Sequence, residues 1–239
     1  MKHLKVTTVA LGGLILLSSC NANNATKGGL IGGGSGALIG GIVGNLIGKN
    51  AGGTAIGAAI GAAVGSGAGV LIGKKMDKAK AAAEAVKNAE VSEVTDANGL
   101  KAVKVTFDSG ILFPTSSSTL QATAKSSLAE FATNVLKQNT DMDVAIQGYT
   151  DNQGWKNSTT EQSAEKNKNL SLQRAQAVST YLKSLGVNTS QIKSVEGLGE
   201  SNPVADNSTE AGRKENRRVE IYLYASEAMI KAAESGNLK

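Results

Sequence analysis

The sequence predicts an α/β fold, an α+β sandwich with helices on one face of a mixed sheet, in the C-terminal half of the chain. Two observations predict it. Apolar residues alternate with polar ones along several short segments, and they recur at helical spacing along two longer segments. The segments follow one another as β-α-β-α-β, with one further strand. That order is typical of a sheet covered by helices.

The predicted strands are short segments whose side chains alternate between two faces. Val103, Val105 and Phe107 alternate with Lys104 and Thr106, which indicates a half-buried strand. The same reasoning predicts strands at 142–148, 192–196 and 219–223.

The predicted helices each carry one apolar stripe. In 120–138 the stripe comprises Leu120, Ala124, Leu128, Phe131 and Val135. In 167–185 it comprises Leu172, Ala175, Val178, Leu182 and Leu185, and Gly186 ends the helix.

Residues 1–19 have the layout of a secretory signal, with Lys2 and Lys5 before an apolar stretch. The sequence Leu17-Ser18-Ser19-Cys20 resembles a bacterial lipobox, which implies that Cys20 is lipidated and that 20–27 is a short linker. The alternative is a plain signal peptide with an incidental cysteine. Asn21 stands where Asp would retain a lipoprotein in the inner membrane, and residues 22–27 contain no acidic run. By this resemblance we expect an outer-membrane anchor and a periplasm-facing body.

Glycine recurs at every fourth residue in two arms. It stands at 28, 32, 36, 40, 44 and 48, and again at 53, 57, 61, 65, 69 and 73, with no charged residue inside either arm. As a helix, each arm would be about 31 Å long, which matches the hydrocarbon core of a bilayer. Small residues four apart let two helices approach closely. We therefore predict a glycine-zipper helical hairpin over 28–73, either embedded in the membrane or packed against other copies. The alternative is a flexible Gly/Ala-rich spacer.

Residues 74–99 are rich in Ala, Lys and Glu and predict an exposed helical connector. The folded domain is expected over 100–225, followed by a tail at 226–239.

The sequence holds one histidine, His3, and one cysteine, Cys20. The chain after Cys20 therefore lacks the residues for Ser-His-Asp or Cys-His catalysis, zinc binding or disulfides. We expect no enzyme, no cofactor and no metal. The basic residues interleave with acidic ones without stacking aromatics, so nucleic acid is a poor candidate partner.

Four motifs follow one another in the C-terminal domain. Gly148-Tyr149-Thr150-Asp151 begins a loop, and Asn167 followed by Leu170-Ser171-Leu172-Gln173-Arg174-Ala175 opens a helix. Gly197-Leu198-Gly199 comes next, and 212–221 (GRKENRRVEI) leads into the last strand. Together they resemble the OmpA-like peptidoglycan-binding domain, over about residues 101–224. The resemblance implies a non-enzymatic domain that binds the diaminopimelate of the wall's stem peptide.

The resemblance also implies the site residues. The family's clamping Asp and Arg match Asp151 and Arg174. A carboxylate suits the ammonium of diaminopimelate, and a guanidinium grips its carboxylate bidentately. Asn167 lies two helical turns before Arg174 and can face the same pocket. Thr150 and Arg217 are further contributors by the same match. The gap between Asp151 and Arg174 is about eight residues longer than the family's, and the extra residues predict a long polar loop from Trp155 to Lys166.

The leading functional hypothesis is a tether, with lipid at one end and the cell wall at the other. An ion-driven stator would need an ionisable residue within a membrane span, and residues 28–73 contain none except Lys49 at the turn. A third hypothesis is a glycine-zipper membrane effector or pore-forming assembly that the wall-binding domain localises. In that case the arms of several copies would self-associate.

Overall fold

The computed structural model describes residues 67–96 and 99–238. The signal segment, Cys20 and the glycine arms as far as residue 66 lie outside the described residues. The predictions made for them stay predictions.

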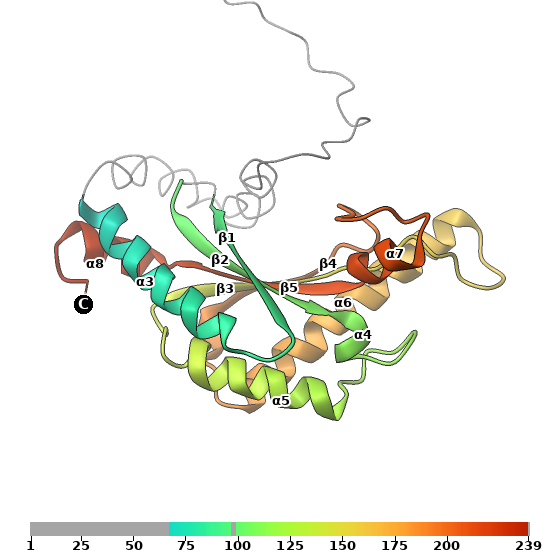
Figure 1. The fold of residues 1–239 in the computed structure, drawn as a ribbon, viewed down its shortest axis with the longest axis horizontal. Coiled ribbons are helices and arrows are strands. Elements are labelled where there is room, and N and C mark those ends of the chain that lie inside the picture. The colour runs from blue at the N-terminus through green and yellow to red at the C-terminus, as the bar shows by residue number, and fades with distance from the viewer. Residues whose placement is uncertain (1–66, 97–98, 239) are drawn as a thin grey trace, which may run out of the picture. The chain divides into compact units, whose positions relative to one another are not determined.

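The described strands form one mixed sheet, as the sequence predicts. The strands are β1 (Ala89–Thr95), β2 (Lys101–Asp108), β3 (Met142–Gly148), β4 (Ile192–Gly197) and β5 (Arg218–Ala225). Their order across the sheet is β1-β2-β5-β3-β4 (Figure 1). β3 and β4 run parallel, and the other neighbours are antiparallel.

The longer helices lie on one face of the sheet (Figure 1). The helices are α3 (Gly67–Glu84), α4 (Ser109–Leu112), α5 (Ala122–Phe131), α6 (Thr160–Ser184), α7 (Glu210–Asn216) and α8 (Glu227–Glu234). A π-helical turn, η1 (Ala132–Leu136), continues α5, and a short 3₁₀ turn, η2 (Thr189–Gln191), precedes β4. The predicted sandwich with helices on one face is confirmed.

The core lies between this face and the helices. Val105 pairs with Ile221 and Phe107 with Val219 across β2 and β5, and all four side chains are buried. Phe107 also meets Phe131 of α5 edge-on, with ring centroids 6.0 Å apart. The apolar positions of the predicted strands therefore face the helices, and the alternate positions face the other side of the sheet.

Two glycines let α6 lie directly on the ends of β3 and β4. A Cβ at Gly148 would stand 2.1 Å from the carbonyl oxygen of Ser171, and one at Gly197 would stand 2.3 Å from the backbone nitrogen of Leu172. Only glycine permits backbone contacts this close. These contacts fix the height of α6 above the strand ends, and with it the position of Arg174.

The prediction of an exposed helical connector over 74–99 is wrong. α3 starts at Gly67 and buries Ile72, Met76, Ala79 and Ala83 in the core, and strand β1 follows it. Small alanines separated by lysines and glutamates form a narrow stripe that packs closely, although the segment looks solvated in sequence. β1 was missed because it is an edge strand in which Val94 alone is fully buried.

The ends of the predicted domain also differ. The tail predicted at 226–239 contains α8, which buries Met229, Ile230 and Ala233 beside α3. α3 includes the last residues of the second glycine arm, and there Ala68 and Ile72 are buried in the core. The folded unit thus begins before residue 100 and continues past residue 225. No helix within 67–96 or 99–238 is long and apolar enough to cross a membrane.

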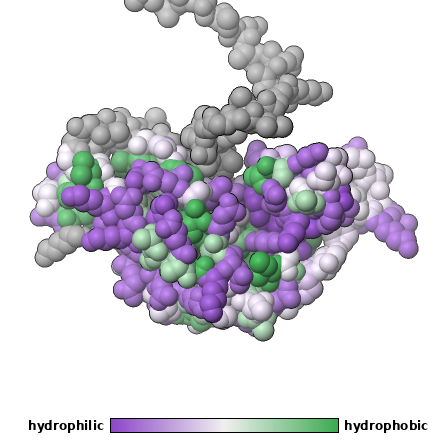
Figure 2. All heavy atoms as spheres, in the orientation of Figure 1, coloured by the Kyte–Doolittle hydropathy of each residue, from purple (hydrophilic) through white to green (hydrophobic). Residues whose placement is uncertain are grey.

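The described surface is mainly polar. Figure 2 shows one face on which hydrophilic residues predominate and apolar ones form small, separate groups. Among the described residues, Val70 and Val204 are the large hydrophobic side chains that stay exposed.

Candidate functional site

All five residues predicted for the binding site line one cavity. It has a volume of about 520 Å³ and lies where β2 and β3 end and β5 begins. The five residues, which come from three separate segments of the chain, are Thr150, Asp151, Asn167, Arg174 and Arg217. The structure brings them together as the motifs predict. Their role in binding stays a prediction.

Asp151 follows β3 and provides the buried acid of the cavity. It is 6% exposed. Arg217 donates a 2.5 Å hydrogen bond from its guanidinium to Asp151 Oδ2, and the backbone N–H of Gln153 donates to Oδ1 over 3.1 Å. These contacts orient the carboxylate.

Arg217 joins two carboxylates at the rim of the cavity. Its second terminal nitrogen donates to Glu210 Oε1 over 2.8 Å. Burial lowers the pKa of Arg217, but the hydrogen bonds to Glu210 and Asp151 outweigh it and raise the pKa overall. Arg217 is therefore a fixed cation that holds Asp151 in place.

Arg174 is the second cation of the cavity and is almost fully buried, at 4% exposed. Its Nε donates to the carbonyl oxygen of Ser117 over 3.0 Å, and its guanidinium carbon lies 5.3 Å from the centre of the Phe113 ring. Burial lowers its pKa to about 10, and the nearby Asp151 opposes this shift. Arg174 thus stays charged at neutral pH. Among the described residues, its two terminal nitrogens donate no hydrogen bond, so they are available to bind a carboxylate.

Asn167 and Trp155 line another side of the cavity. The indole N–H of Trp155 donates to Asn167 Oδ1 over 2.7 Å, and Asn167 Nδ2 donates to the carbonyl oxygen of Gln153 over 3.1 Å. Asn167 therefore ties helix α6 to the loop after Asp151. Trp155 is the only tryptophan in the sequence, which makes it a natural optical reporter of the cavity.

The long polar loop predicted from Trp155 to Lys166 is wrong over most of its length, because α6 begins at Thr160. Thr159 caps the helix, and its hydroxyl accepts the Gln162 backbone N–H while the Gln162 side chain accepts the Thr159 backbone N–H. This is a capping box. The residues of the predicted loop from Thr160 onward therefore belong to the helix, and the loop that remains ends before Thr159.

Sequence reasoning missed Phe113, Ser117 and Glu210, which contact the predicted arginines. Arg174 and Ser117 are 57 residues apart in the chain. No local spacing joins them, and only the fold brings these partners to the site. Glu210 lies in the first turn of α7, where a carboxylate is favoured by the helix dipole. Its position in the sequence is therefore explained by the helix start and does not indicate a binding site.

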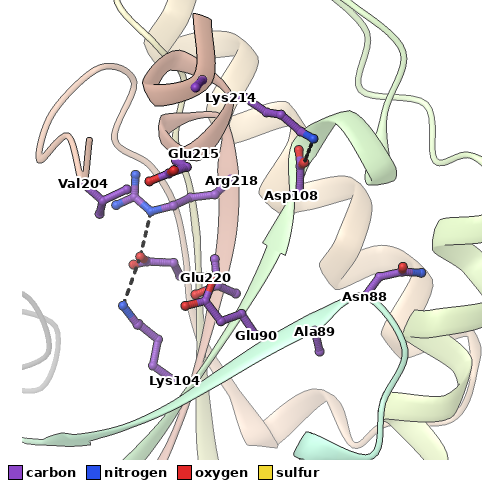
Figure 3. A pocket seen from close by; sticks show the side chains of 12 residues that line it. Asn88, Ala89, Glu90, Lys104, Asp108, Val204, Lys214, Glu215, Arg218 and Glu220 are labelled. Atoms are coloured by element: carbon purple, nitrogen blue, oxygen red, sulfur yellow. Dashed lines mark hydrogen bonds and ion pairs between the residues drawn. The ribbon is translucent and has the colours of Figure 1, made fainter. Parts of the chain in front are cut away.

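A second, larger cavity of about 680 Å³ lies on the sheet face that the longer helices leave uncovered, and residues of α7 line part of it (Figure 3). Arg218, Glu220 and Lys104 point toward one another there. Arg218 Nε donates to Glu220 Oε1 over 2.8 Å, and Lys104 Nζ lies 3.6 Å from the same oxygen (Figure 3). Tyr222 also donates to Glu220 Oε2 over 2.5 Å. The central charges of this cavity therefore satisfy one another, whereas Asp151 and Arg174 face the smaller cavity from separate elements.

The mixed sheet with helices on one face, and the acid and the arginine that line one cavity, agree with the resemblance to OmpA-like domains. Residues 112–217 match the model of the OmpA family, and residues 35–80 match a glycine zipper model. The chain therefore carries an OmpA family domain. Three of the four motifs and all five predicted site residues lie within its matched range, and the fourth motif, 212–221, extends past its end.

Several relatives carry the same domain. The chain is 40% identical over 113 residues to the probable lipoprotein YiaD of Escherichia coli, covering 47% of each chain. It is 37% identical to the outer-membrane lipoprotein YfiB of Pseudomonas aeruginosa, covering 49% of this chain and 64% of YfiB. It is 48% identical to the peptidoglycan-binding protein ArfA of Mycobacterium tuberculosis, covering 37% of this chain and 24% of ArfA. The matches thus span from a quarter to less than two thirds of these relatives.

Solved structures share the fold. A putative MotB-like protein from Desulfovibrio vulgaris matches with a TM-score of 0.53 and 23% identity, over 66% of this chain and 95% of that one. The cell wall anchor of the T6SS from Pseudomonas aeruginosa matches with a TM-score of 0.50 and 24% identity, over 63% of this chain and 97% of that one. At these identities the likeness concerns the fold.

Proposed function

We propose that this chain is an outer-membrane lipoprotein that binds peptidoglycan non-covalently, through the diaminopimelate of the stem peptide, and so tethers the membrane to the wall. The proposal includes lipidation at Cys20, a periplasm-facing domain and no catalysis. One observation carries it: a buried carboxylate, Asp151, and a buried guanidinium, Arg174, line one cavity. A relative named as a peptidoglycan-binding protein supports it.

The chemistry of the cavity suits a zwitterionic amino-acid head group. The far end of diaminopimelate carries one ammonium and one carboxylate. Asp151 is oriented by its hydrogen bond from Arg217, and its oxygens can accept hydrogen bonds from the ammonium. Arg174 is oriented through Nε, which leaves its terminal nitrogens for the carboxylate. A ligand that lacks the carboxylate would leave the buried Arg174 guanidinium without an ion-pair partner, which is costly.

The test is binding of the full chain to purified peptidoglycan sacculi. Asp151→Ala and Arg174→Ala should each weaken binding roughly ten- to a hundredfold, because each removes a charge-assisted contact. Both variants should stay folded in a thermal melt, since both side chains line a cavity and lie outside the apolar core.

The matched controls are Asp77→Ala and Lys183→Ala, which remove exposed charges from α3 and α6 outside the cavity. They should bind sacculi like the wild type. If both cavity variants are folded and bind as strongly as the wild type, the proposed function of the cavity is wrong.

A further inference from the structure

Two hydroxyl groups in the candidate site have no hydrogen-bond partner among the described residues. They are Ser109 Oγ and Thr150 Oγ1. Ser109 is 1% exposed and Thr150 is 5% exposed, and both residues line the cavity of Asp151. A buried polar group without a partner costs about 1–3 kcal/mol. Such groups are rare in native proteins and need an explanation.

The backbone of Ser109 is held on both sides, so its position is fixed. Its N–H donates to the carbonyl oxygen of Arg217 over 2.9 Å, and its carbonyl oxygen accepts the N–H of Phe113 over 2.7 Å. Only the hydroxyl is left over. No motif marks this serine, and its environment comes from the fold.

Ser109 and Thr150 flank the start of β5. Ser109 follows β2 and Thr150 follows β3, and β5 lies between these two strands in the sheet. The residue between them is Arg217, whose guanidinium holds Asp151. Two buried hydroxyls and one buried carboxylate are thus gathered around the first residues of a single strand.

This set fits the hydrogens of a primary ammonium. An ammonium carries three N–H donors, and a carboxylate and hydroxyl oxygens are acceptors for them. We propose that Ser109, together with Thr150, completes the acceptor set that Asp151 begins, so that the site selects stem peptides whose far amine is free. The inference rests on the proposed function, since it takes diaminopimelate as the ligand.

Acylation of that amine would undo the fit. In a cross-linked wall the amine is bound in an amide, which carries a single N–H and no charge. Asp151 would then face a neutral group, and at least one hydroxyl would again be buried without a partner. Desolvated polar groups left unpaired discriminate strongly between ligands. The domain would therefore bind peptidoglycan where its stems are not cross-linked through this amine.

The experiment is calorimetric titration of the full chain in detergent with two peptides. One is N-acetyl-L-Ala-γ-D-Glu-meso-diaminopimelate, which has one free amine. The other is the same peptide with that amine acetylated. The wild type should prefer the free amine by about a hundredfold, the combined loss of the charged contact and a hydroxyl contact. Ser109→Ala should weaken binding of the free-amine peptide about tenfold and leave the acetylated peptide nearly unaffected.

Ser201→Ala is the matched control, because Ser201 is exposed and does not line the cavity. It should bind both peptides like the wild type. Thr150→Val removes the second hydroxyl without changing the side-chain size and should act in the same direction. If Ser109→Ala does not fold, Thr150→Val still tests whether a hydroxyl contacts the amine.

The outcomes separate the two proposals. If the wild type binds the free-amine peptide and neither hydroxyl variant weakens it, the hydroxyls are not ligand contacts and the inference falls, while the proposed function stands. If the wild type binds both peptides equally, the proposed selection for a free amine is wrong, and the inference falls for that reason. If the wild type binds neither peptide, the proposed function and the inference both fail.

Discussion

Arg217 and Arg218 are neighbours in the chain that serve opposite faces of the sheet. Arg217 lines the candidate site, where its side chain is 28% exposed and pairs with Asp151 and Glu210. Arg218 is 5% exposed, pairs with Glu220 and stacks over the Tyr149 ring, 3.8 Å from its centre. Both are arginines paired with acids. The difference is that Glu220 also has Lys104 and Tyr222 as partners, whereas Asp151 shares its cavity with Arg174, whose terminal nitrogens make no hydrogen bond among the described residues.

Burial and charge do not by themselves mark a binding site. The larger cavity, beside Arg218, is also lined by buried charged residues, but Arg218, Lys104 and Tyr222 all converge on Glu220. Such a network holds β2 and β5 together. In the smaller cavity the Arg174 fork and two hydroxyls are left over. Unused binding capacity, more than charge, distinguishes the candidate site from the structural network.

The largest expected effect is on stability and comes from Arg218. Arg218→Met keeps the length of the side chain but removes the cation that pairs with buried Glu220. Breaking a buried ion pair by removing one partner costs roughly 3–5 kcal/mol. We expect the lower end of that range, about 3 kcal/mol, because Lys104 and Tyr222 still contact Glu220. Urea unfolding measures the change in free energy.

Arg217→Met is the matched control for this prediction. Arg217 is itself partly exposed and its partner Glu210 is largely exposed, while buried Asp151 keeps the hydrogen bond from the Gln153 backbone N–H. The loss of Arg217 should therefore cost less stability than the loss of Arg218, about 1–2 kcal/mol. It should instead weaken binding to sacculi by about tenfold, because Asp151 loses the group that orients it. Arg218→Met, measured under conditions where it is folded, should bind normally. Equal destabilisation by the two variants would remove the distinction between the two arginines.

A smaller effect is expected from acid. Burial raises the pKa of the Glu220 carboxyl, but Arg218 and Lys104 outweigh it and hold the pKa below its ordinary value of 4.5. Because the pKa is lower in the folded state, Glu220 contributes stability above pH 4.5 that is lost as the pH falls through the lowered value. The urea concentration at the unfolding midpoint should therefore decrease as the pH is lowered below 4.5. The decrease should be less steep in Glu220→Gln. Identical pH profiles would contradict this role for Glu220.

The sequence predicted the elements whose side chains alternate cleanly. β2, β3 and β5 bury every second residue against the helices, so Val103, Ile146 and Ile221 mark them plainly. The site residues could be predicted for a different reason. Asp151, Asn167 and Arg174 lie within short motifs, and helical spacing places the last two on one face.

The remainder depends on contacts between distant parts of the chain. The α3 stripe is built from small residues among charges, and its burial needs α8 and the sheet beside it. The start of α6 at Thr160 depends on a capping box in a polar stretch with no apolar periodicity. Ser109 is the clearest case, since nothing near it in the sequence separates a buried hydroxyl at a strand end from any other serine.

The most direct test of the central claim compares two kinds of peptidoglycan. Lysine in the stem peptide keeps the far ammonium but lacks the carboxylate beside it, so Arg174 would have no partner. The full chain should bind sacculi with diaminopimelate stems at least about tenfold more tightly than sacculi with lysine stems, and Arg174→Ala should remove most of that difference. Equal binding of the two walls by the wild type would contradict the assignment of this cavity to diaminopimelate.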